Sequence, residues 1–293
     1  QAVEIAVGGS EIWRPTDGAP PSGEAMTLSD GLAYSKNTIT AQLIQQVGPA
    51  KVARLARHMG VRQSKLEAVP SLALGTSPVT LKEMVAAYGT IANGGGYLEP
   101  LLVSRIEDRD GRVIEEFSPQ DPDVALERDV AYTLLDSLRG VINRGTGKDI
   151  RGRYGIRADV AGKTGTTQDN ADGWFILMHR QLVAGAWVGF NDSRVTLRSD
   201  YWGQGAHSAL PVVGDFFGSA LRARLIDPRA RFAAPEESGL WARVRNWFRS
   251  LFSQEPAAEA RPQRIVKPTR KQEPPQEPAT PAPVASPPQA QGD

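Results

Sequence analysis

The sequence contains no cysteine, which excludes disulfide bonds and thiol catalysis. It also contains no uninterrupted apolar run close to the roughly 18 residues of a membrane-spanning helix, and no signal-peptide pattern at its start. The 34 basic and 33 acidic side chains nearly cancel, so no overall field attracts nucleic acid, and we expect no nucleic-acid partner. With 40% apolar and 23% charged residues, the chain has the composition of a globular protein that buries a core.

Histidines are few, and their positions predict neither a metal site nor a catalytic triad. His58, His179 and His207 are scattered along the chain without the spacing of metal ligands. The run Gly94-Gly95-Gly96 ends a helical pattern, whereas a phosphate-binding glycine loop begins one. We therefore expect no metal and no cofactor.

The apolar periodicity changes along the chain from helices to strands. Residues 1–22 are rich in glycine and proline and predict a loop. Helical spacing follows in four segments, which begin near Thr27, Ile39, Pro49 and Thr80. The first half of the chain is therefore predicted to be mainly helical.

Strand patterns dominate the part of the chain that follows. Asp110-Gly111 separates two runs, 101–107 and 112–117, and predicts a hairpin. After one more helix, which carries Val130 and Leu138, strands are expected at three places: 159–167, 174–178 and 182–190. Helices followed by antiparallel strands indicate an α+β fold.

The last 58 residues, 236–293, differ from the rest. We predict a domain over residues 1–235, an amphipathic basic helix over 236–253 and a disordered tail over 254–293. The tail has ten prolines and no aromatic residue, so it cannot bury enough apolar surface to offset its chain entropy. The apolar stripe at 240–252, flanked by arginines, either packs on the domain or rests on anionic lipid.

Two short motifs are candidates for chemistry. Ser35-Lys36-Asn37 lies at a break between two predicted helices, and Lys163-Thr164-Gly165-Thr166 lies on a predicted strand that precedes a strand hairpin. Each motif alone is a weak signal, because Ser-x-Asn is commonly a capping turn and Lys-Thr-Gly is commonly the end of a strand. Their combination and their placement strengthen the signal.

This arrangement resembles the serine penicillin-recognising enzymes, whose signatures are Ser-x-x-Lys, Ser-x-Asn and Lys-Thr-Gly. Longer runs, including "TLSDGLAYSKNTITAQLIQQVG" and "RGTGKDIRGRYGIRADVAGKTGTTQDNADGWF", are similar to class A penicillin-binding proteins over about residues 22–220. The resemblance implies the serine β-lactamase-like transpeptidase fold, in which helices flank an antiparallel sheet and a mainly helical subdomain forms the other wall of the cleft.

The sequence departs from the family at one motif, because none of its serines is followed by lysine three residues later. In the family the Ser-x-x-Lys helix lies some tens of residues before Ser-x-Asn. We therefore expect an N-terminally truncated domain whose nucleophile lies before Gln1, and we prefer truncation to a pseudoenzyme. The chain by itself is then expected to be inactive.

The resemblance also implies roles for the residues that are present. Ser35 would pass a proton to the leaving amine, and Asn37 would bridge the missing lysine and the acyl side-chain amide. Lys163 would hold the Ser35 hydroxyl and attract the donor carboxylate. These three are the predicted catalytic residues.

The rest of the Lys-Thr-Gly segment is predicted to bind substrate. Thr164 and Thr166 are candidates to hold the donor carboxylate, with Thr166 preferred, and the Thr166 N–H would form half of an oxyanion hole. Gly165 would let the substrate or a neighbouring backbone approach closely. Lys36, the variable position of its motif, is interpreted as a solvated side chain.

The function implied is that of a D,D-transpeptidase that cross-links peptidoglycan stem peptides ending in D-Ala-D-Ala through a serine ester. β-Lactams, which imitate D-Ala-D-Ala, would acylate the missing serine. The full-length protein would also carry a glycosyltransferase and a membrane anchor, with this domain on the periplasmic or extracytoplasmic side of the plasma membrane and the 240–252 helix as a second membrane contact. The alternatives are a non-catalytic stem-peptide-binding module and a serine β-lactamase.

Overall fold

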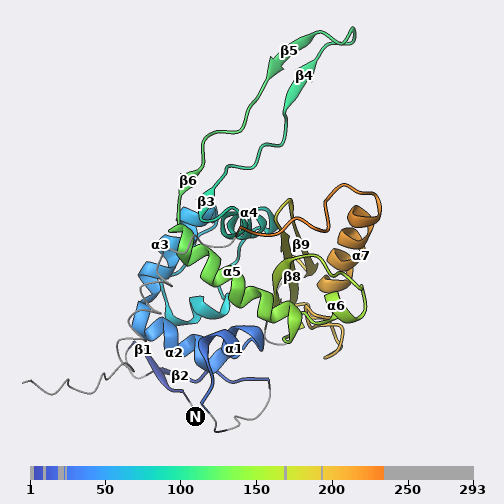
Figure 1. Ribbon diagram of the computed structural model, residues 1–293. Coiled ribbons are helices and arrows are strands. Elements are labelled where there is room, and N and C mark those ends of the chain that lie inside the picture. The colour runs from blue at the N-terminus through green and yellow to red at the C-terminus, as the bar shows by residue number, and fades with distance from the viewer. Residues whose placement is uncertain are drawn as a thin grey trace, which may run out of the picture. The chain divides into compact units, whose positions relative to one another are not determined.

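A three-stranded antiparallel sheet lies at the centre of the computed structural model, which describes residues 3–8, 11–18, 23, 25–167, 170–192 and 194–233 (Figure 1). The strands, in spatial order, are β7 (Val160–Thr166), β8 (Asp172–His179) and β9 (Leu182–Gly189). β7 pairs with β8 from Val160–His179 to Thr166–Gly173, and β9 pairs along the whole of β8. These bounds confirm the three strands that the sequence predicts.

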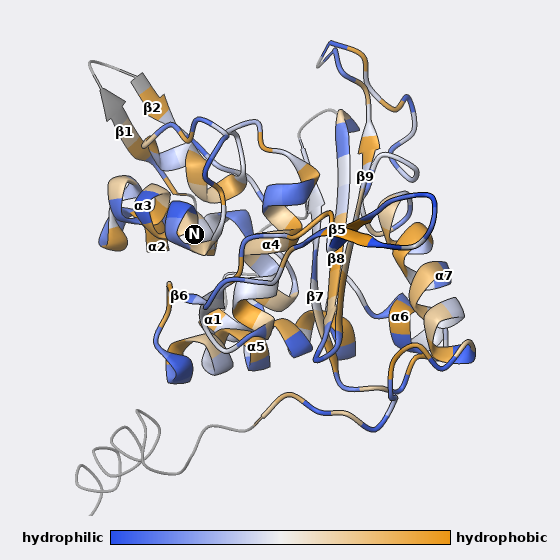
Figure 2. Ribbon diagram, turned by 90° about the horizontal axis from the view of Figure 1, so that it is seen from above, coloured by the Kyte–Doolittle hydropathy of each residue, from blue (hydrophilic) through white to orange (hydrophobic). Residues whose placement is uncertain are grey.

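Helices cover both faces of this sheet (Figure 2). On one face Phe175 and Leu177 of β8 share a core with α7 (Ala209–Arg222) and α6 (Asp149–Gly152). On the other face Met178 packs with α4 (Leu81–Ala92) and α5 (Arg128–Asn143). Successive side chains of a strand point to opposite faces, so β8 contributes alternately to the two cores and reads as a continuous apolar run.

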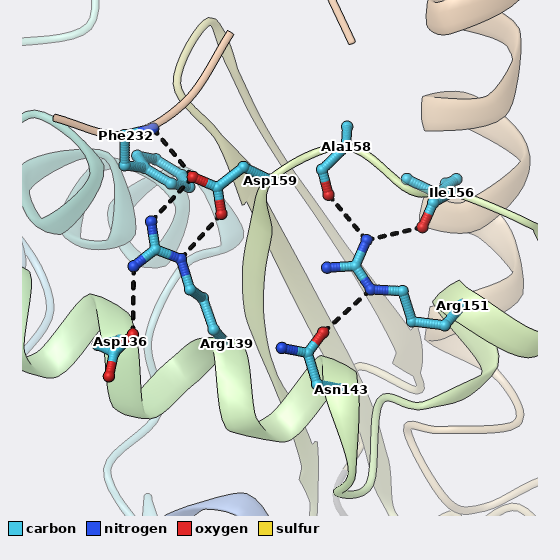
Figure 3. A network of polar contacts seen from close by, with 8 residues as sticks. All are labelled: Asp136, Arg139, Asn143, Arg151, Ile156, Ala158, Asp159 and Phe232. Atoms are coloured by element: carbon cyan, nitrogen blue, oxygen red, sulfur yellow. Dashed lines mark hydrogen bonds and ion pairs between the residues drawn. The ribbon is translucent and has the colours of Figure 1, made fainter. Parts of the chain in front are cut away.

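A half-buried ion pair joins the start of β7 to α5 (Figure 3). The Nε and Nη2 atoms of Arg139, on α5, each donate to one carboxylate oxygen of Asp159 over 2.8 Å, and the Phe232 N–H donates to the same carboxylate over 3.1 Å. Burial alone would raise the pKa of Asp159, but the hydrogen bonds and the charge of Arg139 lower it overall. Nearby, Arg151 donates to two backbone carbonyls just before β7. These contacts therefore fix the start of β7 against α5.

Three helices and a 3-10 turn pack against one another and form a helical part of the domain beside the sheet. They are α1 (Leu28–Ala33), α2 (Asn37–Val47), α3 (Pro49–Met59) and η1 (Pro70–Leu74). Gly48 and Gly60 end α2 and α3 with φ of 90° and 129°, values that favour glycine. The helix starts near Thr27, Pro49 and Thr80 are confirmed, whereas α2 begins two residues before Ile39.

The prediction of a loop over residues 1–22 is wrong in part, because β1 (Ile5–Gly8) and β2 (Glu11–Trp13) form a short hairpin. Ile5 packs with Val3 and with Ala41 of α2 in a small core of its own. A pair of strands this short is marginal in isolation, so tertiary packing explains why local sequence signals miss it.

A second hairpin stands out from the body of the domain (Figure 1). It consists of β4 (Arg105–Glu107) and β5 (Val113–Glu116), and a short pair, β3 (Gly96–Tyr97) with β6 (Asp123–Val124), lies at its base. The turn contains Gly111 at φ 79°, which confirms the hairpin predicted from Asp110-Gly111.

All described residues lie in one compact unit. Among them, no helix is both long enough and apolar enough to cross a membrane. The helix predicted at 236–253 and the proline-rich tail predicted at 254–293 lie outside the described residues.

Glu83 is a buried carboxylate that joins the start of α4 to the segment after α3. Thr80 and Glu83 form a capping box at the helix start that the sequence predicts near Thr80. The Glu83 carboxylate also accepts the backbone N–H groups of Gln63 (2.6 Å) and Ser64 (2.9 Å) and the Ser64 hydroxyl. Burial raises the pKa of this group, but the donors outweigh burial and lower the pKa to about 2.

We expect Glu83→Gln to lower the free energy of unfolding by about 2 kcal/mol, because an amide replaces a charged acceptor of several hydrogen bonds. The pKa is below the ordinary 4.5, so the carboxylate's contribution is complete above about pH 4.5 and is lost as the pH falls toward 2. Urea unfolding at pH 7 and at pH 3 measures both effects. Glu116→Gln, on exposed β5, is the matched control and should leave stability unchanged; equal effects of the two substitutions would contradict the prediction.

Candidate active site

Ser35 lies at the break between α1 and α2 in a conformation that few residues other than glycine adopt. Its φ is 54°, in the left-handed region, which costs a serine about 1 kcal/mol or more. The Lys36 N–H donates to the Gly31 carbonyl over 2.8 Å, which closes the turn. The Ser35 side chain is exposed as a result. The chain therefore holds a strained turn at the residue that the sequence singles out.

Lys163 reaches Ser35 from the middle of β7. Its Nζ donates to Ser35 Oγ over 2.7 Å and to the Thr164 carbonyl over 2.7 Å. Burial lowers the pKa of Lys163 to about 8. The structure therefore brings together two of the three predicted catalytic residues, and it places there a lysine whose proton is labile near neutral pH.

Asn37 lies close by in the chain, but it has a different partner. It is the first residue of α2, and its Nδ2 donates to the Thr16 carbonyl over 2.9 Å. The next residue, Thr38, donates its N–H and its hydroxyl to Asp17. The segment 16–17 therefore crosses the N-terminus of α2 and orients the Asn37 side chain.

The two threonines of the Lys-Thr-Gly-Thr segment have different environments. Thr164 is buried, and its Oγ1 lies 2.6 Å from Oγ1 of Thr146. Thr166 is exposed at the end of β7, and its Oγ1 accepts the Gly205 N–H over 3.1 Å. A hydroxyl that accepts one hydrogen bond can still donate its own proton. Thr166 is thus the threonine that remains accessible to a ligand.

Gly165 allows close packing within the sheet. A Cβ at this position would lie 3.1 Å from the Cβ of Trp174 on the neighbouring strand, tighter than an ordinary contact. On the other side of the same backbone, Gly205 approaches so closely that a Cβ there would lie 2.2 Å from the Gly165 carbonyl oxygen. The sequence suggested that Gly165 lets either the substrate or a neighbouring backbone approach closely. In the structure, the backbone at Gly205 makes this close approach.

The segment 144–147, after α5, joins the two motifs and was missed by the sequence reasoning. The guanidinium of Arg144 lies 2.7 Å from the Asp30 carboxylate on α1. The Thr146 N–H donates to the Ala33 carbonyl over 3.2 Å, while the Thr146 hydroxyl contacts Thr164 on β7. The segment thus bridges the helix before Ser35 and the strand of Lys163. In the sequence this segment is the run "RGTG", which does not indicate which residues it contacts.

A cleft of about 1010 Å³ runs beside β7. The residues from Lys163 to Thr167 form one side. The opposite side comes from η1 and α4 and is largely apolar, with Leu72, Met84 and Tyr88 among its residues. Part of the apolar side of α4 therefore faces this cleft. The arrangement is a polar strand edge opposite an apolar wall.

The fold and the site define a class: an α+β domain of the serine β-lactamase-like kind, in which a Lys-Thr-Gly strand lines the cleft and contacts a Ser-x-Asn turn. The family described as "Penicillin binding protein transpeptidase domain" matches residues 4–179. The chain belongs to this family of penicillin-binding protein transpeptidase domains.

Relatives in sequence agree with this assignment. Penicillin-binding protein 1A of Neisseria gonorrhoeae is 32% identical over 218 residues, which are 73% of this chain and 27% of that protein. Penicillin-binding protein 1A of Pseudomonas aeruginosa is 29% identical over 263 residues, covering 72% of this chain and 31% of that protein. The chain thus spans about a quarter to a third of the length of these relatives.

Solved structures share the fold. Penicillin-binding protein 1A from Haemophilus influenzae has a TM-score of 0.73 at 24% identity, over 81% of this chain and 40% of that chain. The D,D-transpeptidase domain of a peptidoglycan glycosyltransferase from Eggerthella lenta has a TM-score of 0.59 at 23% identity, over 76% and 59%. PonA1 from Mycobacterium tuberculosis in complex with penicillin V has a TM-score of 0.58 at 22% identity, over 80% and 64%.

We expect Lys163 to titrate near pH 8, because burial disfavours its charged form. Competitive labelling of lysines with limiting acetic anhydride between pH 6 and 11, followed by mass spectrometry, measures the pKa of each lysine in the intact protein. An exposed lysine of the same chain, such as Lys51 on α3, serves as the internal reference. Titration of Lys163 together with the exposed lysines would show that the site is fully hydrated.

Proposed function

We propose that this chain supplies part of the active site of a D,D-transpeptidase that cross-links peptidoglycan stem peptides through a serine ester. The observation that carries the proposal is the 2.7 Å contact between Lys163 Nζ and Ser35 Oγ at the side of the cleft. Membership of the transpeptidase family supports it independently. Ser35, Asn37 and Lys163 are the catalytic residues proposed within the chain.

In this reaction a serine attacks the penultimate carbonyl of D-Ala-D-Ala, the terminal D-Ala leaves, and an amine of another stem peptide resolves the ester. A proton must reach the departing amine. The Ser35 hydroxyl can donate one proton while it accepts another from Lys163, and a lysine with a pKa of about 8 supplies it readily near neutral pH. The pair thus forms a short proton path at the cleft.

The substrate would lie along β7 as an added strand. Within the described residues β7 pairs on one side only, with β8, so its other edge offers N–H and C=O groups to an extended peptide. The Lys163 charge and the Thr166 hydroxyl would hold the donor carboxylate, and the Thr166 N–H would supply half of an oxyanion hole. Thr164 would act by fixing the strand through Thr146, since its hydroxyl is already paired.

The ester-forming serine is not among these 293 residues, because none of their serines is followed by lysine three positions later. We infer that it belongs to sequence outside them. A helix that carries it would pack on the apolar wall of the cleft, where Met84 and Tyr88 are only half-buried. Burying such side chains stabilises a fold by about 2 kcal/mol each.

For the whole protein we propose the features expected for a bifunctional class A enzyme. These are a peptidoglycan glycosyltransferase in addition to the transpeptidase, a membrane anchor outside the described residues, and an extracytoplasmic location for this domain. Similarity to penicillin-binding proteins 1A supports them. Stem peptides and β-lactams are the proposed ligands.

We expect the full-length protein to be labelled covalently by fluorescent penicillin, and the 293-residue chain not to be labelled, because the chain lacks the serine. Lys163→Ala should slow labelling of the full-length protein by about 100-fold or more, since it removes the donor to Ser35 and a fixed charge. Lys51→Ala on α3 is the control and should label normally. Labelling of the chain itself would place the nucleophile within it, and an unlabelled full-length protein would favour the non-catalytic module.

Thr146 is expected to be a positioning residue for this reaction. Thr146→Val removes the 2.6 Å contact with Thr164 and should slow acylation of the full-length protein by about 10-fold, equivalent to roughly 1.4 kcal/mol. Thr146→Ser keeps the hydroxyl and should restore the rate. Stopped-flow acylation measures this, and urea unfolding controls for stability. A Ser variant as slow as the Val variant would contradict the role of the hydroxyl.

A further inference from the structure

Three aromatic rings form a cluster on the loop between β9 and α7. Tyr201 and Trp202 are 55% and 57% exposed, and the ring of His207 stacks on Tyr201 with centroids 3.8 Å apart and planes 11° from parallel. Trp202 meets Tyr201 edge-on at 5.1 Å. The His207 Nδ1 atom lies 3.0 Å from the Tyr201 carbonyl oxygen, which ties the two residues further. We name these three residues the aromatic ledge.

The ledge is fixed to the end of β7. Gly205, between Trp202 and His207, donates its N–H to Thr166, and its backbone packs so closely on β7 and β8 that no side chain fits. On the other side of the ledge, the Asn170 amide donates to Asp200 over 3.1 Å. The exposed rings therefore keep a constant position relative to the Lys-Thr-Gly strand.

The chemistry of the ledge favours a flat, partly apolar ligand. Large exposed rings such as those of Tyr201 and Trp202 leave apolar surface in water that a ligand can cover. A hexopyranose ring has faces made of C–H groups and a rim of hydroxyls, so it stacks on an aromatic face while its rim remains hydrated. Three side chains offer at most a few hundred square ångströms, which is less than the roughly 800 Å² per partner of a stable protein interface.

The position of the ledge agrees with the path of the proposed substrate. With the donor carboxylate between Lys163 and Thr166 and the reacting carbonyl at the Thr166 N–H, the rest of the stem peptide continues beyond the end of β7. Four extended residues span about 13 Å. The sugar that carries the peptide then arrives on the side of the domain where the ledge lies.

We propose that the aromatic ledge binds hexopyranose rings of the glycan strand to which the donor stem peptide is attached. This inference rests on the proposed transpeptidase function and adds a saccharide subsite to it. Such a subsite lets the enzyme prefer donor peptides on a polymer to free peptides.

The test compares two donors in the full-length protein: stem peptide attached to glycan, and the same peptide without sugar. Tyr201→Ala/Trp202→Ala should raise the KM ratio of glycan-linked to free donor by about 5- to 10-fold. Tyr201→Phe/Trp202→Phe keeps the rings and should keep the ratio. Phe216→Ala, which removes an exposed ring from α7, is the matched control and should change neither KM.

Direct binding of a tetramer of N-acetylglucosamine, measured by isothermal titration calorimetry, gives a readout that needs no catalysis. Its affinity should fall about 10-fold or more in the Ala variant and persist in the Phe variant. Equal KM changes for the two donors, or unchanged binding of the tetramer, would overturn the proposal and leave the ledge to a protein partner. Penicillin acylation is measured in parallel, so a failure of the proposed transpeptidase function is seen separately.

Discussion

The contact between Lys163 and Ser35 is the constraint on which the rest of this structure depends. It joins two residues that are 128 positions apart in the sequence, over 2.7 Å. Each partner is held in a state that is unfavourable in free energy. Ser35 occupies a left-handed backbone conformation, and Lys163 is desolvated enough for its pKa to fall to about 8. Neither would persist in an isolated loop or strand. The surrounding fold must therefore stabilise the pair.

Two sets of contacts supply that stabilisation from opposite ends of β7. At the start of the strand, Arg139 and Asp159 join it to α5 through a half-buried, doubly hydrogen-bonded ion pair. Near its other end, Thr146 meets Thr164 while its backbone holds the helix before Ser35. Because α5 leads directly into segment 144–147, one helix positions both motifs. This gives α5 a functional importance that its ordinary amphipathic sequence does not suggest.

Local sequence signals predicted those elements whose cause is local. Thr80 and Glu83 mark the start of α4 because a capping box involves only neighbouring residues. Asp110-Gly111 marks the β4–β5 turn because its backbone needs a positive φ. The hairpin of β1 and β2 was missed because its stability comes from packing on α2. The helix predicted to begin near Thr80 is confirmed as α4, but that part of its apolar side lines the cleft could not be derived from its periodicity.

The same division between local causes and tertiary packing applies to the residues of the site. The residue types of Ser-x-Asn and Lys-Thr-Gly, the break between two helices and the strand that carries the lysine could all be derived from the chain alone, because each depends on residues a few positions apart. The meeting of Lys163 with Ser35, the burial of Thr164 against Thr146 and the aromatic ledge beside Thr166 were decided by tertiary structure. They join segments separated by tens of residues, and only the packing of helices on the sheet specifies which segments become neighbours.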